Sequence, residues 1–390
     1  MNILYVCHKD PRLLVGGNEI RTHWLWLALK QKGKVYTLVL RSCQTTEIEY
    51  DKEDHRIVFV NPSTKGFSLN RIVYAILGRL SGVPVFPIAR STNIKIKELF
   101  PIRKYDLVVA RYIYSFKFFH LWNYAPVLVD YDDSPEQVYD TLIRLNLPRL
   151  FRVLGLFLVK WQTNYVNDRI FGGWLSNSEQ LNKADKKISY LPNIPNLPNL
   201  DYLPALKNEK MYLLTLGVMS YAPNYSGVNR FVSEVWPTFY KNHPNVRYVI
   251  GGKDAPVEMG TLWNSIPGVQ YVGFIDDLED AYRNCIATII PIYSGGGTCI
   301  KTLESLSYFR VCLSTPFGTR GIAENIDKDD VGILVFNNVS EFEEKFLLLL
   351  DSNKRTRMEL SARSFIDQNY SFDVFKKNVN IQIQRLEAMM

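Results

Sequence analysis

A glycine-rich segment in the last quarter of the chain has the residue types of an anion site. Residues 294–304 read SGGGTCIKTLE and follow an apolar run that ends near Ile292. Glycines let backbone N–H groups approach a ligand closely, and the positive end of a following helix would point at the same place. The segment therefore predicts an anion site, best matched to a diphosphate, to which Lys301 adds a charge.

Two further side chains of this segment could contact the same ligand. Thr298 could cap the helix or hydrogen-bond a phosphate oxygen. Glu304 lies one turn beyond Lys301, where a carboxylate can accept hydrogen bonds from both hydroxyls of a ribose. The alternative is a flexible loop in which Glu304 pairs with a lysine.

A cluster of carboxylates forms a second candidate site. Asp130, Asp132 and Asp133 fall within four residues and follow the apolar run 127–129. Three such charges repel one another, so a fold tolerates them only with compensation. Asp132 or Asp133 could order the hydroxyls of a ligand or act as a base. In the alternative interpretation, Ser134 or one of these aspartates caps a helix that begins after Pro135.

The first loop of the chain also contains paired glycines. Gly16 and Gly17 precede Glu19 and Arg21 at the start of a helical pattern. The glycines would let the N–H groups of the helix reach an anionic ligand, and Arg21 could face a cleft. A generic turn between a strand and a helix would also use glycine.

The segments around these residues alternate between short apolar runs and helical patterns, which is typical of parallel sheets covered on both faces. In the first half we expect strands at Ile3–Cys7, Val35–Leu40, Ile57–Val60, Leu107–Ala110, Val127–Asp130 and Ile170–Ser176, and a helix over Glu19–Lys32. In the second half we expect strands at Tyr212–Leu216, Val246–Ile250, Val269–Val272, Ala287–Pro291 and Val311–Ser314. Helices are expected there at Tyr225–Tyr240, Cys299–Ser307, Glu341–Leu350, Asn353–Asn369 and Phe372–Glu387.

A proline- and asparagine-rich stretch between Leu191 and Lys207 predicts a linker, because its four prolines exclude a helix interior or a central strand. We expect one domain over residues 1–190, a linker over 191–210, a second domain over 211–370 and a terminal helix over 371–390 that packs back on the first domain. The predicted fold class is α/β, with two Rossmann-like doubly wound domains facing across a cleft. Ligands then sit at the carboxyl ends of the strands.

Composition restricts the partners of the chain. Its 390 residues include 46 Lys and Arg against 39 Asp and Glu, a net charge of +7. This surplus suits an acidic ligand or an anionic membrane surface but is too diffuse to indicate nucleic acid. Five cysteines without a CxxC pair and five histidines without ligand spacing predict neither a disulfide framework nor structural zinc. We expect a cytoplasmic protein, since the N-terminus resembles a buried strand more than a signal peptide.

One apolar segment could contact a membrane. No stretch of about 20 apolar residues occurs, so no transmembrane helix is predicted. Residues 148–161, PRLFRVLGLFLVKW, are strongly apolar and carry three cations. They could lie in an anionic membrane interface, which would place the protein peripherally on the inner face of the plasma membrane, or form a buried helix of the first domain.

Several of these motifs resemble glycosyltransferases of the GT-B fold, family 4 (the group 1 transferases). The block GGGTCIKTLE resembles the GGGTRxKxLE of one bacterial subgroup, with Cys299 where arginine is usual. Further similar segments are GVMSYAPN at 217–224 with VWP at 235–237, VGFIDDL at 272–278, LPN at 191–193 and GGxE at 16–19. The resemblance covers most of residues 190–325 and the extreme N-terminus.

The resemblance implies transfer of a sugar, with retention, from a nucleoside-diphosphate sugar to a glycan or lipid-linked acceptor in bacterial surface polysaccharide synthesis. UDP- or GDP-sugars are the expected donors, with no cofactor or metal required. Asp132, Asp133 and Lys301 are the expected catalytic residues, and Gly16, Glu19 and Arg21 the acceptor-side candidates. Nucleotide and phosphate contacts are expected from Gly17, Gly217, Asn224, Phe274, Gly296, Gly297, Thr298, Lys301 and Glu304.

The sequence departs from the family pattern at two places. The family's ribose-binding glutamate matches Glu304, but the first acid of that pair falls on Gly296. The basic pair that holds the diphosphate in many relatives is absent from residues 220–226, so phosphate binding must rely on Lys301, the glycine loop and Asn224. Phe274 could contact the nucleobase or belong to the core. The alternatives are a non-catalytic nucleotide-sugar-binding partner protein and a nucleotide-sugar epimerase of the same fold.

Overall fold

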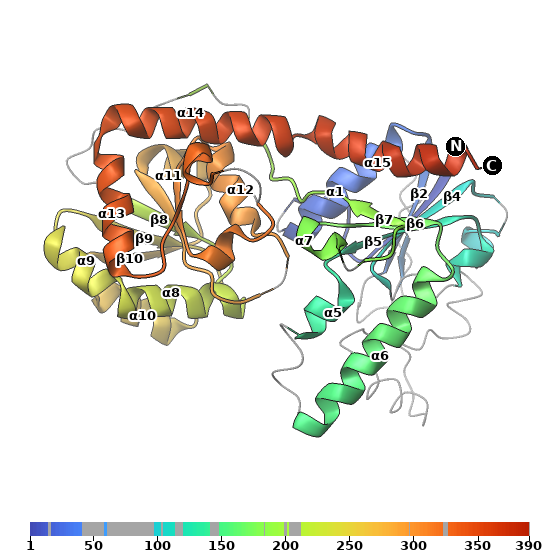
Figure 1. Cartoon of the computed structure of the whole chain (residues 1–390), viewed down its shortest axis with the longest axis horizontal. Helices are drawn as coiled ribbons and strands as arrows, with labels where there is room; N and C mark the ends of the chain where they lie inside the picture. The colour runs from blue at the N-terminus through green and yellow to red at the C-terminus, as the bar shows by residue number, and fades with distance from the viewer. Residues whose placement is uncertain are drawn as a thin grey trace. The chain divides into compact units, whose positions relative to one another are not determined.

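A computed structural model describes the chain in two units (Figure 1). The described residues are 1–14, 17–40, 58–60, 97–102, 104–113, 120–140, 148–182, 184–198, 201–202, 212–295, 297–322 and 327–389. Unit 1 comprises Met1–Asn193 and Phe372–Met390, and unit 2 comprises Ile194–Ser371. Gly16, Gly296 and most of the predicted linker beyond Pro198 lie outside the described residues.

Unit 1 contains a parallel sheet. Its strands are β1 (Asn2–Cys7), β2 (Lys34–Leu40), β3 (Val58–Val60), β4 (Leu107–Arg111), β5 (Val127–Asp132), β6 (Gly172–Leu175) and β7 (Ile188–Tyr190). They lie in the order β3-β2-β1-β4-β5-β6-β7, so the order reverses between β1 and β4. Residues of β1, β4 and β5 are buried along almost their whole length, as the apolar runs predicted for a sheet covered on both faces.

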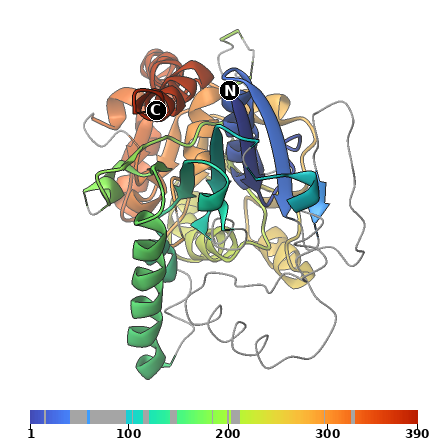
Figure 2. The same cartoon turned by 90° about the vertical axis from the view of Figure 1, so that its right-hand side faces the viewer.

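Helices cover both faces of this sheet, with α1 and α15 on one face and α6 on the other (Figures 1 and 2). The helices of unit 1 are α1 (Gly17–Lys30), α5 (Pro135–Val138), α6 (Arg149–Asn167), α7 (Ser178–Leu181) and α15 (Phe372–Glu387), with a 3-10 turn at Leu121–Asn123. The rings of Trp24 and Phe372 lie 5.2 Å apart between α1 and α15. Gln382 of α15 also donates to the Ser189 hydroxyl of β7 at 2.7 Å. The last helix of the chain is therefore part of unit 1.

Unit 2 repeats the same strand order. Its strands are β8 (Tyr212–Leu216), β9 (Arg247–Gly251), β10 (Val269–Gly273), β11 (Ala287–Ile290), β12 (Cys312–Ser314) and β13 (Ile333–Val335). They form a parallel sheet in the order β10-β9-β8-β11-β12-β13, with the reversal between β8 and β11. Two doubly wound parallel sheets are thus present, and the expected α/β fold class is confirmed.

Two apolar clusters pack helices of unit 2 against its sheet. The helices are α8 (Ala222–Glu234), α9 (Trp236–Asn242), α10 (Val257–Ser265), α11 (Leu278–Asn284), α12 (Ile300–Ser307), α13 (Val339–Leu350) and α14 (Ser352–Asn369), with 3-10 turns at Pro316–Thr319 and Asp329–Val331. The neighbours Leu213 and Leu214 of β8 enter different clusters, because successive strand residues face opposite sides of a sheet.

The single helix predicted over Tyr225–Tyr240 is wrong. The structure has α8 and α9 there, with a break at Val235. Pro237 has no backbone N–H to donate to the carbonyl of Ser233, and its ring would clash with that carbonyl, so α8 ends before it. The same missing N–H is tolerated in the first turn of α9.

Candidate functional site

The glycine loop of unit 2 joins β11 to α12, at the edge where the strand order reverses. Gly295 and Gly297 have φ angles of 130° and 67°, which side chains rarely adopt. Cys299, and not Thr298, is the residue that precedes α12, and no side chain caps this helix end. Backbone N–H groups at such an end suit an anion. Thr298 is buried in the loop, with 7% of its surface exposed.

The structure brings Lys301, Asn224 and Gly217 together. The Lys301 amine donates to the Asn224 side-chain oxygen at 2.9 Å, and the Asn224 amide donates to the carbonyl of Val218 at 2.8 Å. A Cβ atom at Gly217 would lie only 2.6 Å from Cε of Lys301 and 2.9 Å from Nδ2 of Asn224. Glycine is therefore required after β8 for the lysine to occupy this position, beside the glycine loop that follows β11.

Glu304 lies one turn further along α12 and bonds to a tyrosine. The Tyr282 hydroxyl donates to Glu304 Oε1 at 2.6 Å, and the Tyr282 ring stacks on Tyr308 with a centroid separation of 4.3 Å. Burial raises the pKa of the Glu304 carboxyl above its ordinary value, although the Tyr282 hydrogen bond and the Lys301 charge oppose the shift. The Tyr282 hydrogen bond thus fixes the orientation of the Glu304 carboxylate, which lies in a partly buried environment.

Sequence reasoning missed Arg320, which supplies a second cation at the glycine loop. Its guanidinium donates from Nη2 to the carbonyl of Gly297 at 2.5 Å and lies 4.1 Å from the centroid of the Phe317 ring. Its position shortly after β12 was the available signal, because ligand-binding residues gather at the carboxyl ends of parallel strands. Residues 220–226 contain no such cation, whereas Lys301 and Arg320 are two basic groups beside this loop.

Phe274 follows β10, and 66% of its surface is exposed. This exposure rules out the alternative that Phe274 belongs to the core. Its neighbour Ile275 packs instead toward Gly251, where an added Cβ atom would lie 2.5 Å from the Ile275 side chain. Phe274 therefore remains a candidate for stacking on a nucleobase.

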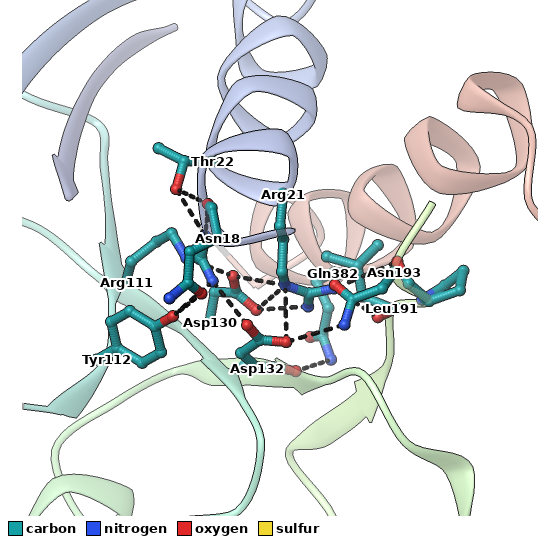
Figure 3. A network of polar contacts seen from close by, with 12 residues as sticks. Asn18, Arg21, Thr22, Arg111, Tyr112, Asp130, Asp132, Leu191, Asn193 and Gln382 are labelled. Carbon is teal, nitrogen blue, oxygen red and sulfur yellow. Dashed lines mark hydrogen bonds and ion pairs between the residues drawn. The ribbon is translucent and has the colours of Figure 1, made fainter. Parts of the chain in front are cut away.

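A buried network of charges occupies the carboxyl edge of the sheet in unit 1 (Figure 3). Arg21 of α1 contacts Asp130 with an Nη2–Oδ1 distance of 2.6 Å, and Arg111 of β4 contacts the same carboxylate at 3.1 Å. All three side chains are at most 1% exposed. The compensation that the aspartate cluster requires thus comes from two arginines distant in sequence, and Arg21 lies in the interior of unit 1.

Asp132 is the more accessible carboxylate of this network, with 16% of its side chain exposed. Arg111 Nη2 lies 3.0 Å from Oδ2, and the Asn193 amide donates to Oδ1 at 3.2 Å. Burial would raise the pKa of Asp132, but Arg21 and Arg111, with hydrogen bonds from Asn193 and Ser176, outweigh it and leave the pKa below its ordinary value. Asp132 therefore remains ionised at neutral pH.

The backbone around Asp132 is strained. Asp132 at the end of β5 and Tyr112 just after β4 have φ angles of 63° and 64°, a left-handed conformation that is uncommon outside glycine. The register between β5 and β6 also shifts between Asp130 and Asp132. Such strain persists only where the surroundings enforce it, and it concentrates at functional sites. Here the two guanidinium groups hold the Asp132 carboxylate in place.

The remaining candidates of unit 1 lie near this network. The Gln180 amide donates to Asp133 Oδ1 at 3.4 Å, and Ser134 caps α5 by accepting from the backbone N–H of Gln137. Ser134 therefore performs the capping role of the alternative interpretation. Glu19 forms an ion pair of 2.8 Å with Lys9. Gly17 begins α1.

The described residues show neither a group of metal ligands nor a membrane-spanning helix. No three His, Cys, Asp or Glu side chains are grouped there as ligands for a metal ion. None of the described helices combines the length and the apolar character needed to cross a membrane.

Comparison with known proteins agrees with this arrangement. Residues 210–352 match the model of a family described as glycosyl transferases, group 1. No curated protein matches the chain by sequence. Sucrose-phosphate synthase from Thermosynechococcus elongatus is similar in structure over 100% of both chains, with a TM-score of 0.70 and 12% identity.

Two further structures of similar fold contain UDP. The Anabaena protein HepE, in complex with UDP and glucose, has a TM-score of 0.62 and 11% identity, covering 99% of this chain and 100% of its own. A mutant of S. aureus TarM, in complex with fondaparinux, alpha-GlcNAc-glycerol and UDP, has a TM-score of 0.65 and 11% identity, covering 98% and 99%. At these identities the likeness is one of fold. The likeness to glycosyltransferases rests on the family match over residues 210–352 and on this shared fold.

Proposed function

We propose that the chain is a retaining glycosyltransferase that moves a sugar from a nucleoside-diphosphate donor to a glycan or lipid-linked acceptor in bacterial surface polysaccharide synthesis. UDP is favoured over GDP as the nucleotide, because two proteins of similar fold were solved with UDP. The proposed location is the cytoplasm, and the proposed reaction needs no metal or other cofactor.

The observation that carries the proposal is the meeting of Lys301, Asn224 and Gly217 beside the glycine loop. This is the position where the strand order of unit 2 reverses and where doubly wound sheets bind nucleotides. Lys301 and Arg320 give two positive charges for a diphosphate, and the uncapped end of α12 adds its N–H groups. Glu304, fixed by Tyr282, would then accept from the ribose hydroxyls.

The same groups explain how transfer could be accelerated. As the bond between the sugar and the diphosphate breaks, negative charge grows on the leaving phosphate. Lys301, Arg320 and the start of α12 are already ordered around the place where that charge develops, so little reorganisation is needed. The sugar passes through an oxocarbenium-like state, which the departing phosphate stabilises.

In unit 1, Asp132 is proposed to accept hydrogen bonds from a sugar or acceptor hydroxyl. A general base works best when its pKa is near the operating pH, and the pKa of Asp132 is lowered. Orientation by a fixed carboxylate therefore fits Asp132 better than proton abstraction. Asp133, which accepts a hydrogen bond from the amide of Gln180, is the remaining candidate for a base.

The test begins with nucleotide binding. Calorimetry and thermal shift are measured with UDP, GDP, ADP, CMP and dTDP in the presence of EDTA. A rise in melting temperature with one diphosphate supports a metal-independent donor site and names its base. Product formed with the matching nucleotide sugar is then examined by NMR, where the anomeric coupling reports retention or inversion. No binding of any nucleotide would contradict the proposal.

A further inference from the structure

Helix α6 carries an apolar face that the rest of the described structure leaves open. One side of the helix is buried in unit 1, through Gln162, Thr163 and two valines that are 0% exposed, Val159 and Val166. The opposite side exposes Phe151, Val153, Leu154, Phe157 and Trp161, with exposed fractions of 43%, 76%, 46%, 65% and 54%. We call these five residues the α6 face. Figures 1 and 2 both show the first half of α6 extending beyond the sheet.

The five side chains form one continuous stripe. Val153, Phe157 and Trp161 follow each other at intervals of four residues, so they lie on one line along the helix. Leu154 and Phe151 extend this line to the side. With a rise of about 1.5 Å per residue, the line from Val153 to Trp161 is about 12 Å long. Contiguous exposed apolar patches are uncommon on soluble proteins, and where they occur they usually mark an interaction surface.

The charges around the α6 face indicate what it contacts. The helix sequence RLFRVLGLFLVKWQTNYVN contains no acidic residue, and its three cations include Lys160 beside Trp161. The whole chain carries a net charge of +7. We propose that α6 lies flat on an anionic lipid surface, with the α6 face in the interfacial layer and the exposed Lys160 at the lipid headgroups. The helix would lie on the membrane, not span it.

The charges also argue against the α6 face as a contact between two copies. In a two-fold dimer the same surface meets itself, so Lys160, which is exposed beside the α6 face, would approach Lys160 of the other copy. No acidic residue of α6 is present to neutralise it. Like charges brought together oppose binding, whereas anionic headgroups would attract the same cations. The inference does not depend on the proposed transferase activity.

The test uses the full chain and vesicles of two compositions. One set is phosphatidylcholine alone, and in the other phosphatidylglycerol replaces part of it. We expect the wild-type chain to sediment with the anionic vesicles and to bind the neutral ones at least several-fold more weakly. The double variant V153S/F157S should bind the anionic vesicles at least about tenfold more weakly than the wild type, because two apolar side chains leave the interface.

A matched control makes the same chemical change elsewhere. Val257 and Leu262 of α10 are 84% and 51% exposed, so V257S/L262S should bind like the wild type. Vesicles with brominated acyl chains should quench the fluorescence of Trp161, and the W161F variant should lose that quenching. Equal binding of V153S/F157S and wild type, or no vesicle binding by the wild type, would overturn the inference. A wild-type dimer that V153S/F157S dissociates, without vesicle binding, would assign the α6 face to a second copy instead.

Discussion

The Lys301 amine lies 2.9 Å from the side-chain oxygen of Asn224, so α12 and the first turn of α8 are joined by a lysine and a neutral amide. A neutral partner orients the ammonium group without cancelling its charge, which leaves that charge available to an anion. An acidic residue at position 224 would have neutralised the positive charge of Lys301.

The first prediction concerns this lysine. K301A should weaken UDP binding by about 2 kcal/mol, or roughly thirtyfold, because a charge-assisted contact to phosphate is lost. Uridine, which has no phosphate, should bind K301A and wild type alike in calorimetry. N224D should act in the same direction through neutralisation. An equal loss for uridine and UDP would show that Lys301 supports the fold of the site and does not contact phosphate.

Arg320 is the second cation at the glycine loop, and its contribution can be separated from folding. R320Q should lower the turnover rate about tenfold or more, since one charge at the leaving group is removed. R320K keeps the charge and should recover part of that rate. The measurement is initial velocity at saturating donor, with UDP affinity measured in parallel. Full activity of R320Q would show that Arg320 does not stabilise the leaving phosphate.

The Glu304 carboxylate should favour UDP binding but lower the stability of the folded protein at neutral pH. Its pKa is raised in the folded chain, so the folded state binds the proton more tightly than the unfolded one. The stability of the wild type should therefore fall as the pH rises above 4.5 through the raised pKa, a loss that E304Q avoids. E304Q should be the more stable protein at neutral pH, by urea unfolding, and yet bind UDP more weakly.

The pH dependence of binding checks the same residue. The ratio of the UDP dissociation constants of E304Q and wild type should be largest at neutral pH and approach one in acid, where Glu304 is protonated. Titration of the phosphate affects both proteins and cancels in the ratio. A ratio that does not change with pH would contradict ribose binding by the Glu304 carboxylate.

Mutation of Asp132 and mutation of Asp133 should have different effects on the stability of the protein. D132N leaves two buried guanidinium groups with one carboxylate and should destabilise unit 1 by about 2–4 kcal/mol. D133N should change stability by less than about 1 kcal/mol. Because the folded pKa of Asp132 is below 3.8, its contribution is present above that pH and is lost as the pH falls through the folded value. The difference between wild type and D132N in urea unfolding should therefore shrink in strong acid.

Two glycines of unit 2 give a contrast between function and stability. In G217A the new Cβ atom meets the flexible end of Lys301, which can move, so the fold should survive while UDP affinity falls. In G227A the Cβ atom would lie 1.8 Å from the backbone oxygen of Pro291, which cannot move easily. We expect G227A to destabilise the protein by about 2–3 kcal/mol in spite of the better helix propensity of alanine. Thermal unfolding with and without UDP separates the two outcomes.

The sequence was most informative where one segment forms the feature by itself. The strand at Tyr212–Leu216 and the helix at Phe372–Glu387 were predicted with the bounds that the structure has. The three-residue strands β7 and β13 were missed, whereas β3 and β12, which are equally short, were predicted. Helix α10 was missed as well, since its buried positions are few.

The sequence was least informative about partners that only the fold brings together. The acidic cluster at residues 130–133 predicted that cations must lie nearby. It could not indicate Arg21 and Arg111, which come from α1 and β4 and are 109 and 21 positions from their aspartate partners. Arg320 was missed for the same reason, since its contact with Gly297 depends on the packing of neighbouring strands.

Unit 1 is assembled from the two ends of the chain, with Phe372–Met390 added to Met1–Asn193. On the ribosome, α1 and β7 therefore emerge long before the helix that contacts them. At roughly 5–20 residues per second, synthesis of unit 2 delays α15 by on the order of ten seconds or more. Until Phe375, Val379 and Ile383 arrive, all of which are fully buried in the finished protein, their apolar partners in unit 1 stay uncovered. Unit 2 is then the part that can complete its folding first, and the nascent first unit is the part that needs protection from aggregation.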